Sequence, residues 1–266
     1  MGHRIARGYQ SLRFNSARYF EDEGNIMSTT QIAGGACALL MLAAPQTLLA
    51  QDVADGTGFY IGADVGIASI SDAEIVYNDG ADSAGGQIDT DSAASFGGVL
   101  GYDFGTVRTD LEIDYSRNKI SALTIDTLNG TAVNLTAQDR ADICDFLEVD
   151  TCGGSGNTFE FDGSRVRQLS AMANLWLDLP IGSVITPYAG GGLGIAGFEL
   201  DGEGEGKFAW QIGAGLAFNV SPSAALSLDF RHRQVSSTEI EYDESSGFEL
   251  GKLETNTFSA GVRFTF

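Results

Sequence analysis

Proline, cysteine, histidine and basic residues are all scarce in this sequence of 266 residues. It contains 4 prolines, 3 cysteines and 2 histidines, and its 15 Lys+Arg face 36 Asp+Glu, which gives a net charge of −21. So little proline excludes collagen-like and proline-rich linker proteins. A chain this acidic would repel the phosphates that a nucleic-acid-binding protein must neutralise, so we expect no nucleic-acid partner.

Long apolar stretches are also rare, and the one that is present covers residues 32–50. Pro45 interrupts it and the small residue Ala50 ends it, which is typical of a secretory signal peptide cleaved after Ala50. A membrane anchor is the alternative, although the stretch falls short of the ~20 apolar residues that a spanning helix needs. Beyond residue 50 the chain has no apolar run of that length, so it is either soluble or crosses a membrane as strands.

The start of the functional chain is expected at Met27. A start at Met1 would place the acidic run 21–23 between the basic residues Arg4, Arg7, Arg13 and Arg18 and the apolar core, whereas a signal peptide has a positively charged region before that core. We therefore predict an N-terminal extension and signal peptide over residues 1–50, followed by one exported domain over residues 51–266.

Two cysteines, Cys144 and Cys152, lie close together in the exported part. Export places them in an oxidising compartment, so a local disulfide is expected, and two free thiols are the alternative. No histidine lies near the pair, so a zinc site is not expected. Residues 201–206 imitate the start of a calcium loop, but Ile212 stands where the bidentate glutamate belongs. We predict neither a metal nor a cofactor.

Strict alternation of apolar and polar side chains is the main signal in the exported part. A strand turns successive side chains to opposite faces, so a period of two indicates a two-sided wall. In residues 107–116 an apolar set alternates with a fully polar one. Eight segments show the pattern: residues 59–67, 95–104, 107–116, 168–177, 187–197, 208–219, 226–233 and 257–266.

The connections between these segments alternate in length. The short turns are residues 105–106, 180–183 and 221–223, and the long connections are residues 69–93, 118–163, 199–207 and 234–256. Short turns at one end and long loops at the other, on an even number of strands, are typical of an outer-membrane barrel. The sequence therefore predicts an all-β fold, an eight-stranded antiparallel up-and-down transmembrane β-barrel.

Glycines indicate which face of the wall points inward. Gly190, Gly192, Gly194, Gly213 and Gly215 belong to the polar face, and small residues suit the interior of an eight-stranded barrel, which its own side chains fill. We therefore expect the apolar face to meet lipid and the polar face to line the lumen. The alternative is a soluble lipocalin-like binding barrel, in which the two faces are reversed.

Charged residues on an inward face must find partners, because an unpaired buried ion is costly. We predict a packed, ion-paired lumen without a continuous open pore, and a small-solute porin is the alternative. The predicted network consists of Asp64, Asp110, Glu112, Asp114 and Asp229 with Arg231, Arg233 and Arg263.

The long connections are strongly acidic, with 24 Asp and Glu between them. Such a surface would attract divalent cations and basic partners and repel polyanions. Solvation and colloidal repulsion alone would also account for it.

Residues for catalysis are not evident in the exported part. Its one histidine, His232, would have to carry any histidine-based mechanism. Barrel lipid A deacylases pair a histidine with a serine two positions later, where this chain has Gln234. We predict that the protein is not an enzyme.

Four motifs carry a resemblance to a known family. They are residues 169–179, 186–195 and 210–216, and the terminal pattern Phe-x-Ala-x-Val-x-Phe-x-Phe that ends at Phe266. On these motifs the chain, from about residue 56 onward, resembles the OmpA-like, opacity-type family of eight-stranded outer membrane β-barrel proteins. The extended second long loop, with its two cysteines, departs from the family pattern.

The resemblance implies a place in the outer membrane of a Gram-negative bacterium, with extracellular loops and periplasmic termini. It also implies that Phe264 and Phe266 belong to the signal read by the barrel assembly machinery, after delivery by periplasmic chaperones. Contact with outer membrane lipid and lipopolysaccharide follows, and a monomer is expected. The implied function is a structural and surface role: envelope integrity, surface-exposed acidic loops and adhesion.

Overall fold

The structure is a computed structural model, and it describes residues 57–71, 73–78, 82–146, 153–160, 165–179, 181, 184–200, 203–241 and 247–266. The chain divides into two compact units, Met1–Gln51 and Asp52–Phe266, and every described residue belongs to the second. The predicted signal peptide lies outside the described residues and stays a prediction. Within the described part, no helix combines the length and the apolar character needed to cross a membrane.

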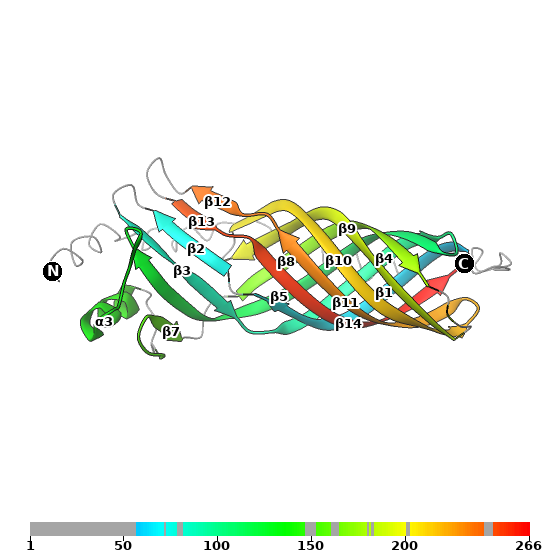
Figure 1. Cartoon of the computed structure of the whole chain (residues 1–266), viewed down its shortest axis with the longest axis horizontal. Coiled ribbons are helices and arrows are strands. Elements are labelled where there is room, and N and C mark those ends of the chain that lie inside the picture. Colours follow the sequence, from blue (N-terminus) through cyan, green and yellow to red (C-terminus); the bar gives the residue numbers. More distant parts are fainter. Residues whose placement is uncertain are drawn as a thin grey trace, which may run out of the picture. The chain divides into compact units, whose positions relative to one another are not determined.

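Eight long strands form a closed antiparallel ring (Figure 1). The ring closes where its first and last strands pair, with Tyr60 opposite Thr265 and Ile70 opposite Thr255. In ring order the strands are β1 (Gly58–Ile70), β4 (Ala93–Asp103), β5 (Val107–Leu128), β8 (Arg165–Asp178), β9 (Ile185–Leu200), β10 (Glu203–Ser221), β11 (Ala224–Val235) and β14 (Leu253–Thr265). The prediction of an eight-stranded antiparallel barrel is therefore confirmed.

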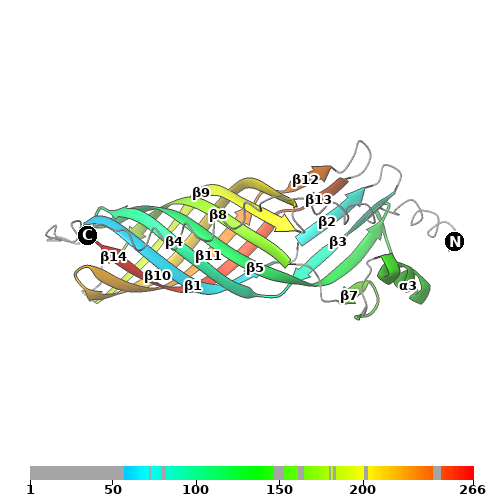
Figure 2. The same cartoon turned by 180° about the vertical axis from the view of Figure 1, so that it is seen from behind.

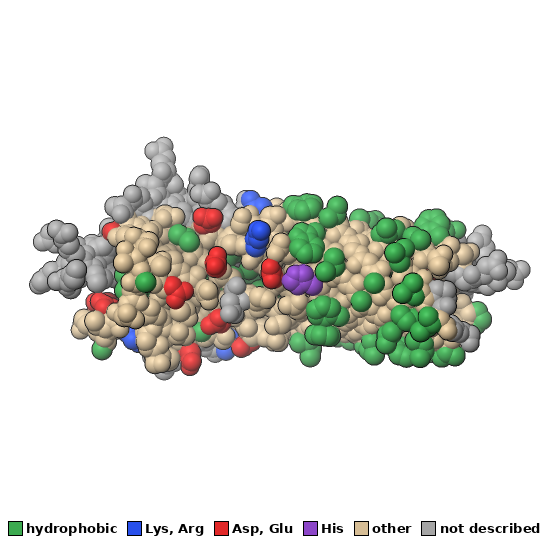
Figure 3. All heavy atoms as spheres, in the orientation of Figure 1, with side chains coloured by type: hydrophobic (Ala, Val, Ile, Leu, Met, Phe, Trp, Pro, Cys, Tyr) green, Lys and Arg blue, Asp and Glu red, His purple; other side chains and the backbone are tan. Residues whose placement is uncertain are grey.

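The two faces of the ring are inverted relative to a soluble barrel. On β5, Leu111 is 64% exposed whereas its neighbour Glu112 is 1% exposed. Hydrophobic side chains cover the half of the barrel that holds the C-terminus (Figure 3). The exposed leucines from Leu169 to Leu179 span about 25 Å on a strand tilted by about 40°, which is the height of the apolar band of a membrane barrel. The predicted orientation of the faces is confirmed.

The polarity of the faces reverses toward the other end of the barrel. On β5 the buried inward side chains change from Ser116 and Asn118 to Ile120, while the outward ones change from Tyr115 to Arg117. A buried apolar cluster fills the interior at this level, formed by Ile70, Ala73, Met172, Ala196, Ala209, Val235 and Leu253. An apolar interior with a charged exterior is the pattern of a protein in water, so the lipid-facing band ends near Tyr115.

The strands continue beyond this level, where the sequence predicts loops. The expectation of a long loop over residues 118–163 is wrong in part, because β5 runs on to Leu128. The other elements of this end are β2 (Ala73–Asn78), β3 (Ser83–Thr90), β6 (Thr131–Ala132), α3 (Ala137–Phe146), β7 (Thr158–Glu160), β12 (Thr238–Glu241) and β13 (Gly247–Leu250). These strands pair in the order β12, β13, β2, β3, and β3 pairs with the part of β5 from Ile120 to Leu128. They lie at the end of the barrel away from the C-terminus (Figure 1, Figure 2).

Inward glycines make room for the large polar side chains of the lumen. A Cβ atom on Gly192 would overlap the side chain of Asn174. In the same way, a Cβ atom on Gly215 would overlap the ring of Tyr188. The glycines of β9 and β10 thus allow side chains from neighbouring strands to cross the narrow lumen.

The substitution Gly192→Val is expected to lower the free energy of unfolding by about 1–3 kcal/mol, because its methyl groups would displace Asn174 from Glu112. Urea titration of the refolded barrel, followed by its heat-modifiable shift on gels, measures the change. Gly206→Val is the matched control, since a Cβ atom there has nothing within 4 Å. Equal costs at the two positions would contradict the close fit.

Candidate functional site

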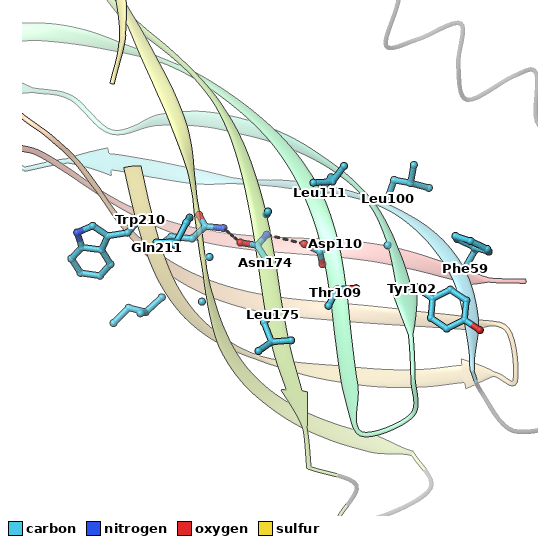
Figure 4. Close-up of a pocket in the computed structure, with 16 residues that line it drawn as sticks. Phe59, Leu100, Tyr102, Thr109, Asp110, Leu111, Asn174, Leu175, Trp210 and Gln211 are labelled. Carbon is cyan, nitrogen blue, oxygen red and sulfur yellow. Dashed lines mark hydrogen bonds between the residues drawn. The ribbon is translucent and has the colours of Figure 1, made fainter. Parts of the chain in front are cut away.

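Glu112 lies at the centre of a polar network inside the barrel. Its carboxylate accepts hydrogen bonds from Asn174 Nδ2 at 2.9 Å, Gln211 Nε2 at 3.2 Å and Arg233 at 3.1 Å. Asn174 also donates to Asp110 at 2.8 Å and accepts from Gln211 at 2.8 Å. Figure 4 shows this row of Asp110, Asn174 and Gln211, in which the hydrogen bond between Asn174 and Gln211 passes over the intervening strand β9 at Gly192. Because the three come from β5, β8 and β10, the network ties separate parts of the wall together.

Two arginines of β11 form ion pairs with four of the buried acids. Arg233 lies 3.1 Å from both Glu112 and Asp114. Arg231 lies 3.5 Å from Asp64 and 3.6 Å from Glu112. It also lies 3.7 Å from Asp229, which in turn accepts a hydrogen bond from the Tyr188 hydroxyl. The structure thus brings together Asp64, Glu112, Asp114, Asp229, Arg231 and Arg233 from the predicted network.

The two remaining members of the predicted lumen network, Asp110 and Arg263, do not form ion pairs with described residues. Asp110 has no arginine or lysine within ion-pair distance among the described residues, and accepts hydrogen bonds from Tyr60 Oη at 2.6 Å and Trp176 Nε1 at 3.0 Å. Arg263 likewise forms no ion pair with a described acid, and its guanidinium carbon lies 5.5 Å from the centre of the Tyr60 ring. Neutral donors therefore stabilise one acid that the sequence suggested was ion-paired.

One ion pair was not foreseen from the sequence. Arg108 Nε donates to Asp178 at 2.8 Å near the short-turn end of the lumen, where both side chains are buried. Arg108 also lies over the ring of Tyr188, 4.8 Å from its centre. The sequence placed Arg108 on the polar face of residues 107–116, which indicated an inward side chain. Its partner Asp178 lies just after the alternating segment 168–177 and was therefore not considered as a lumen residue.

Little space remains inside this network. A cavity of about 50 Å³ lies among Asp64, Asp110, Asp229, Arg231 and Arg263, which leaves room for only a few water molecules. Within the described residues, no three His, Cys, Asp or Glu side chains gather into a group that could hold a metal ion. The arrangement is suited to holding the wall rigid and to blocking the lumen.

A larger hollow of about 1010 Å³ lies along the wall of the barrel. Exposed leucines and isoleucines line much of it, among them Leu100, Leu111, Leu193 and Ile212. Outward apolar side chains of a membrane barrel face hydrocarbon, so this hollow is part of the lipid-facing surface.

The two remaining groups of predicted site residues lie at opposite ends of the domain. Phe264 is 49% exposed on the outward face of β14, and the backbone N–H of Phe266 donates to the Phe59 carbonyl at 2.9 Å. Their role as an assembly signal stays a prediction. Cys144 in α3 is disulfide-bonded, but Cys152 lies outside the described residues, so the pairing of the two also stays a prediction.

Comparisons with known proteins found both sequence relatives and similar solved structures. An uncharacterized protein of Brucella abortus (strain 2308) and one of Brucella suis biovar 1 are each 25% identical over 209 residues, covering 65% of this chain and 68% of their own. Among solved structures, the outer membrane protein OprG from Pseudomonas aeruginosa matches at a TM-score of 0.48 and 13% identity, over 79% of this chain and 97% of its own. Neisserial surface protein A matches at 0.42 and 18%, with the same coverages.

A family model matches most of the chain. It covers residues 35–266 and is described as an outer membrane protein beta-barrel domain. Together with the inverted faces and the closed ring of strands, this match identifies an integral outer membrane protein. The chain belongs to the outer membrane protein beta-barrel domain family.

Proposed function

We propose that this protein is a closed, non-enzymatic barrel, a monomer that holds a folded acidic domain at the outer surface of the cell. At the end of the barrel away from the C-terminus, which we call the loop end, β2, β3, β12 and β13 extend the sheet of β5 beyond the lipid-facing band. This folded loop end is the observation that supports the proposal. Strands that end at the membrane would suffice for anchoring alone. A folded extension of this kind indicates that the loop end itself contributes to function, through envelope integrity or adhesion.

The helical segment of the loop end is held by several contacts. Arg140 in α3 donates to the carbonyl oxygens of Gly153 at 2.9 Å, Gly156 at 2.7 Å and Thr158 at 2.9 Å. Its guanidinium carbon also lies 4.4 Å from the centre of the Phe159 ring, which is fully buried. These contacts hold α3 against residues 153–159, and a surface held in one shape binds a partner at a lower entropic cost.

The proposed orientation places this loop end outside the cell and the short turns in the periplasm. An epitope tag between β12 (Thr238–Glu241) and β13 (Gly247–Leu250) tests it. We expect antibody to label intact cells carrying this tag. The matched control is the same tag in the short turn between β10 and β11, which should be labelled only after permeabilisation. The reverse pattern would overturn the orientation.

A small-solute porin is the competing function. The network around Glu112 and the residual cavity of about 50 Å³ support a blocked lumen instead. In planar bilayers we expect no large, steady conductance from the refolded protein. Swelling of liposomes in graded sugars would contradict the blocked lumen.

Assembly completes the proposal. The outward Phe264 and the terminal Phe266 fit an aromatic signal for the barrel assembly machinery, with periplasmic chaperones as the earlier partners. Outer membrane lipid and lipopolysaccharide would surround the folded wall, because exposed apolar side chains form its surface in the band below Tyr115.

A further inference from the structure

Four of the 15 Lys+Arg of this acidic chain gather on one patch of the outer wall. Arg117 and Lys119 lie on β5, and Arg165 and Arg167 lie on the neighbouring β8. The strand register places Arg117 opposite Arg167 and Lys119 opposite Arg165. We name these four residues the basic patch.

The members of the basic patch point away from the lumen. Ser116 and Asn118 are buried on the inward side of β5, so Arg117 and Lys119 between and beyond them face outward. Gln168 is likewise buried on the inward side of β8, so Arg167 faces outward. Residues directly opposite on paired antiparallel strands have Cβ atoms about 5 Å apart, and like charges there are destabilising. Two such pairs in succession therefore favour an anion bound between them.

The patch lies at the edge of the lipid-facing band. Tyr115 and Leu169, which pair directly, are the last exposed apolar residues of β5 and β8 before the patch. Arg117 and Arg167 follow two residues further along, about 5 Å higher on a tilted strand. This height is that of the lipid headgroups, where a tyrosine commonly marks the boundary.

Two members of the basic patch have partners within the chain. The backbone of Arg167 pairs with that of Glu199 on β9, and the backbone N–H of Asp91 donates to the Lys119 carbonyl. Lys119 and Arg167 have further interactions within the chain. By contrast, Arg117 and Arg165 are exposed, and neither forms an ion pair within the part of the chain that the structure describes.

We propose that the basic patch binds the phosphate groups of a phosphorylated lipid headgroup in the leaflet at the loop end. Arginine forks match phosphate oxygens in pairs, and the lipid's acyl chains would lie along the exposed apolar wall below Tyr115 and Leu169. The choice of leaflet rests on the proposed orientation, in which this leaflet is the outer one and contains lipid A. The binding itself depends only on the patch.

Native mass spectrometry of the refolded protein in a neutral detergent, titrated with diphosphoryl lipid A, tests the proposal. We expect saturable binding that weakens as salt rises. The double variant Arg117→Gln/Arg165→Gln should bind about 25-fold more weakly, at about fivefold for each cation removed. Both positions are exposed, so the variant should fold, and its heat-modifiable gel shift checks this.

Two matched controls accompany the double variant. Lys207→Gln/Lys252→Gln removes the same charge from the same end of the barrel and should change the affinity less than twofold. Lipid A stripped of its phosphates should bind the wild-type protein at least as weakly as diphosphoryl lipid A binds the double variant. Equal affinities for the two lipids, or a double variant that binds like the wild type, would overturn the proposal. Inside-out labelling of the epitope tags would overturn the orientation alone.

Discussion

Replacing Glu112 with alanine is expected to lower the free energy of unfolding of the barrel by about 3–5 kcal/mol, the usual cost of breaking a buried ion pair from one side. The substitution would leave Arg233 and Arg231 without the carboxylate that lies 3.1 Å and 3.6 Å from them. It would also remove the acceptor of hydrogen bonds from Asn174 and Gln211. Asp114 would still pair with Arg233, and Asp64 and Asp229 with Arg231, so the buried donors that lose their shared acceptor supply most of the expected effect.

The same urea titration and gel shift used for Gly192→Val measure this loss. Glu112→Gln keeps the shape of the side chain and removes its charge, so it should cost a large part of the alanine effect. Glu74→Ala is the control, because Glu74 is exposed on β2 and its loss should cost less than about 0.5 kcal/mol. A Glu112→Ala barrel as stable as the Glu74→Ala barrel would show that the network does not hold the wall.

Local alternation, the lengths of the connections and the glycines of the polar face were together sufficient to predict the ring and its inverted faces. The pattern in residues 107–116 predicted a strand with two distinct faces, because a period of two fixes the face of every residue once one is placed. The glycines then indicated which face points inward. The same rule explains the error beyond residue 116. Strand β5 continues to Leu128, but beyond residue 116 its inward side becomes apolar, as at Ile120. A search for strands with an apolar outward face therefore stops at residue 116.

Partner choice in the lumen could not be predicted, because it depends on the register between strands far apart in sequence. Asp110 hydrogen-bonds Tyr60 and Trp176, which are 50 and 66 residues away. Their inward positions follow from alternation, but their height relative to Asp110 does not. Likewise, Arg263 is inward as predicted, yet its level in the lumen places it beside the Tyr60 ring instead of an acid.

The basic patch was hidden for the same reason. Arg117 and Arg167 are 50 residues apart and become neighbours only through the pairing of β5 with β8. In sequence, each is one cation next to an alternating segment. Only the register brings the four cations together at one height.

Arginine in place of Leu111 is expected to lower the free energy of unfolding of the barrel in a lipid bilayer by about 2–4 kcal/mol, since a cation at the membrane midplane cannot be hydrated. Leu111 is 64% exposed and lies midway along the outward run of β5 between Val107 and Tyr115. Its distance from both membrane surfaces leaves the guanidinium no short route to the headgroups.

Leu179→Arg provides the matched control for Leu111→Arg. Leu179 is 58% exposed just beyond the end of β8, near the short turn, where the same substitution should cost at most about 1 kcal/mol. Urea unfolding of both variants in vesicles, followed by tryptophan fluorescence, measures the difference. If this wall faced water, neither substitution would change the free energy of unfolding much, because an exposed leucine in water can be replaced by arginine with little effect. A depth-dependent cost therefore tests the lipid-facing assignment directly, and equal costs at the two positions would contradict it.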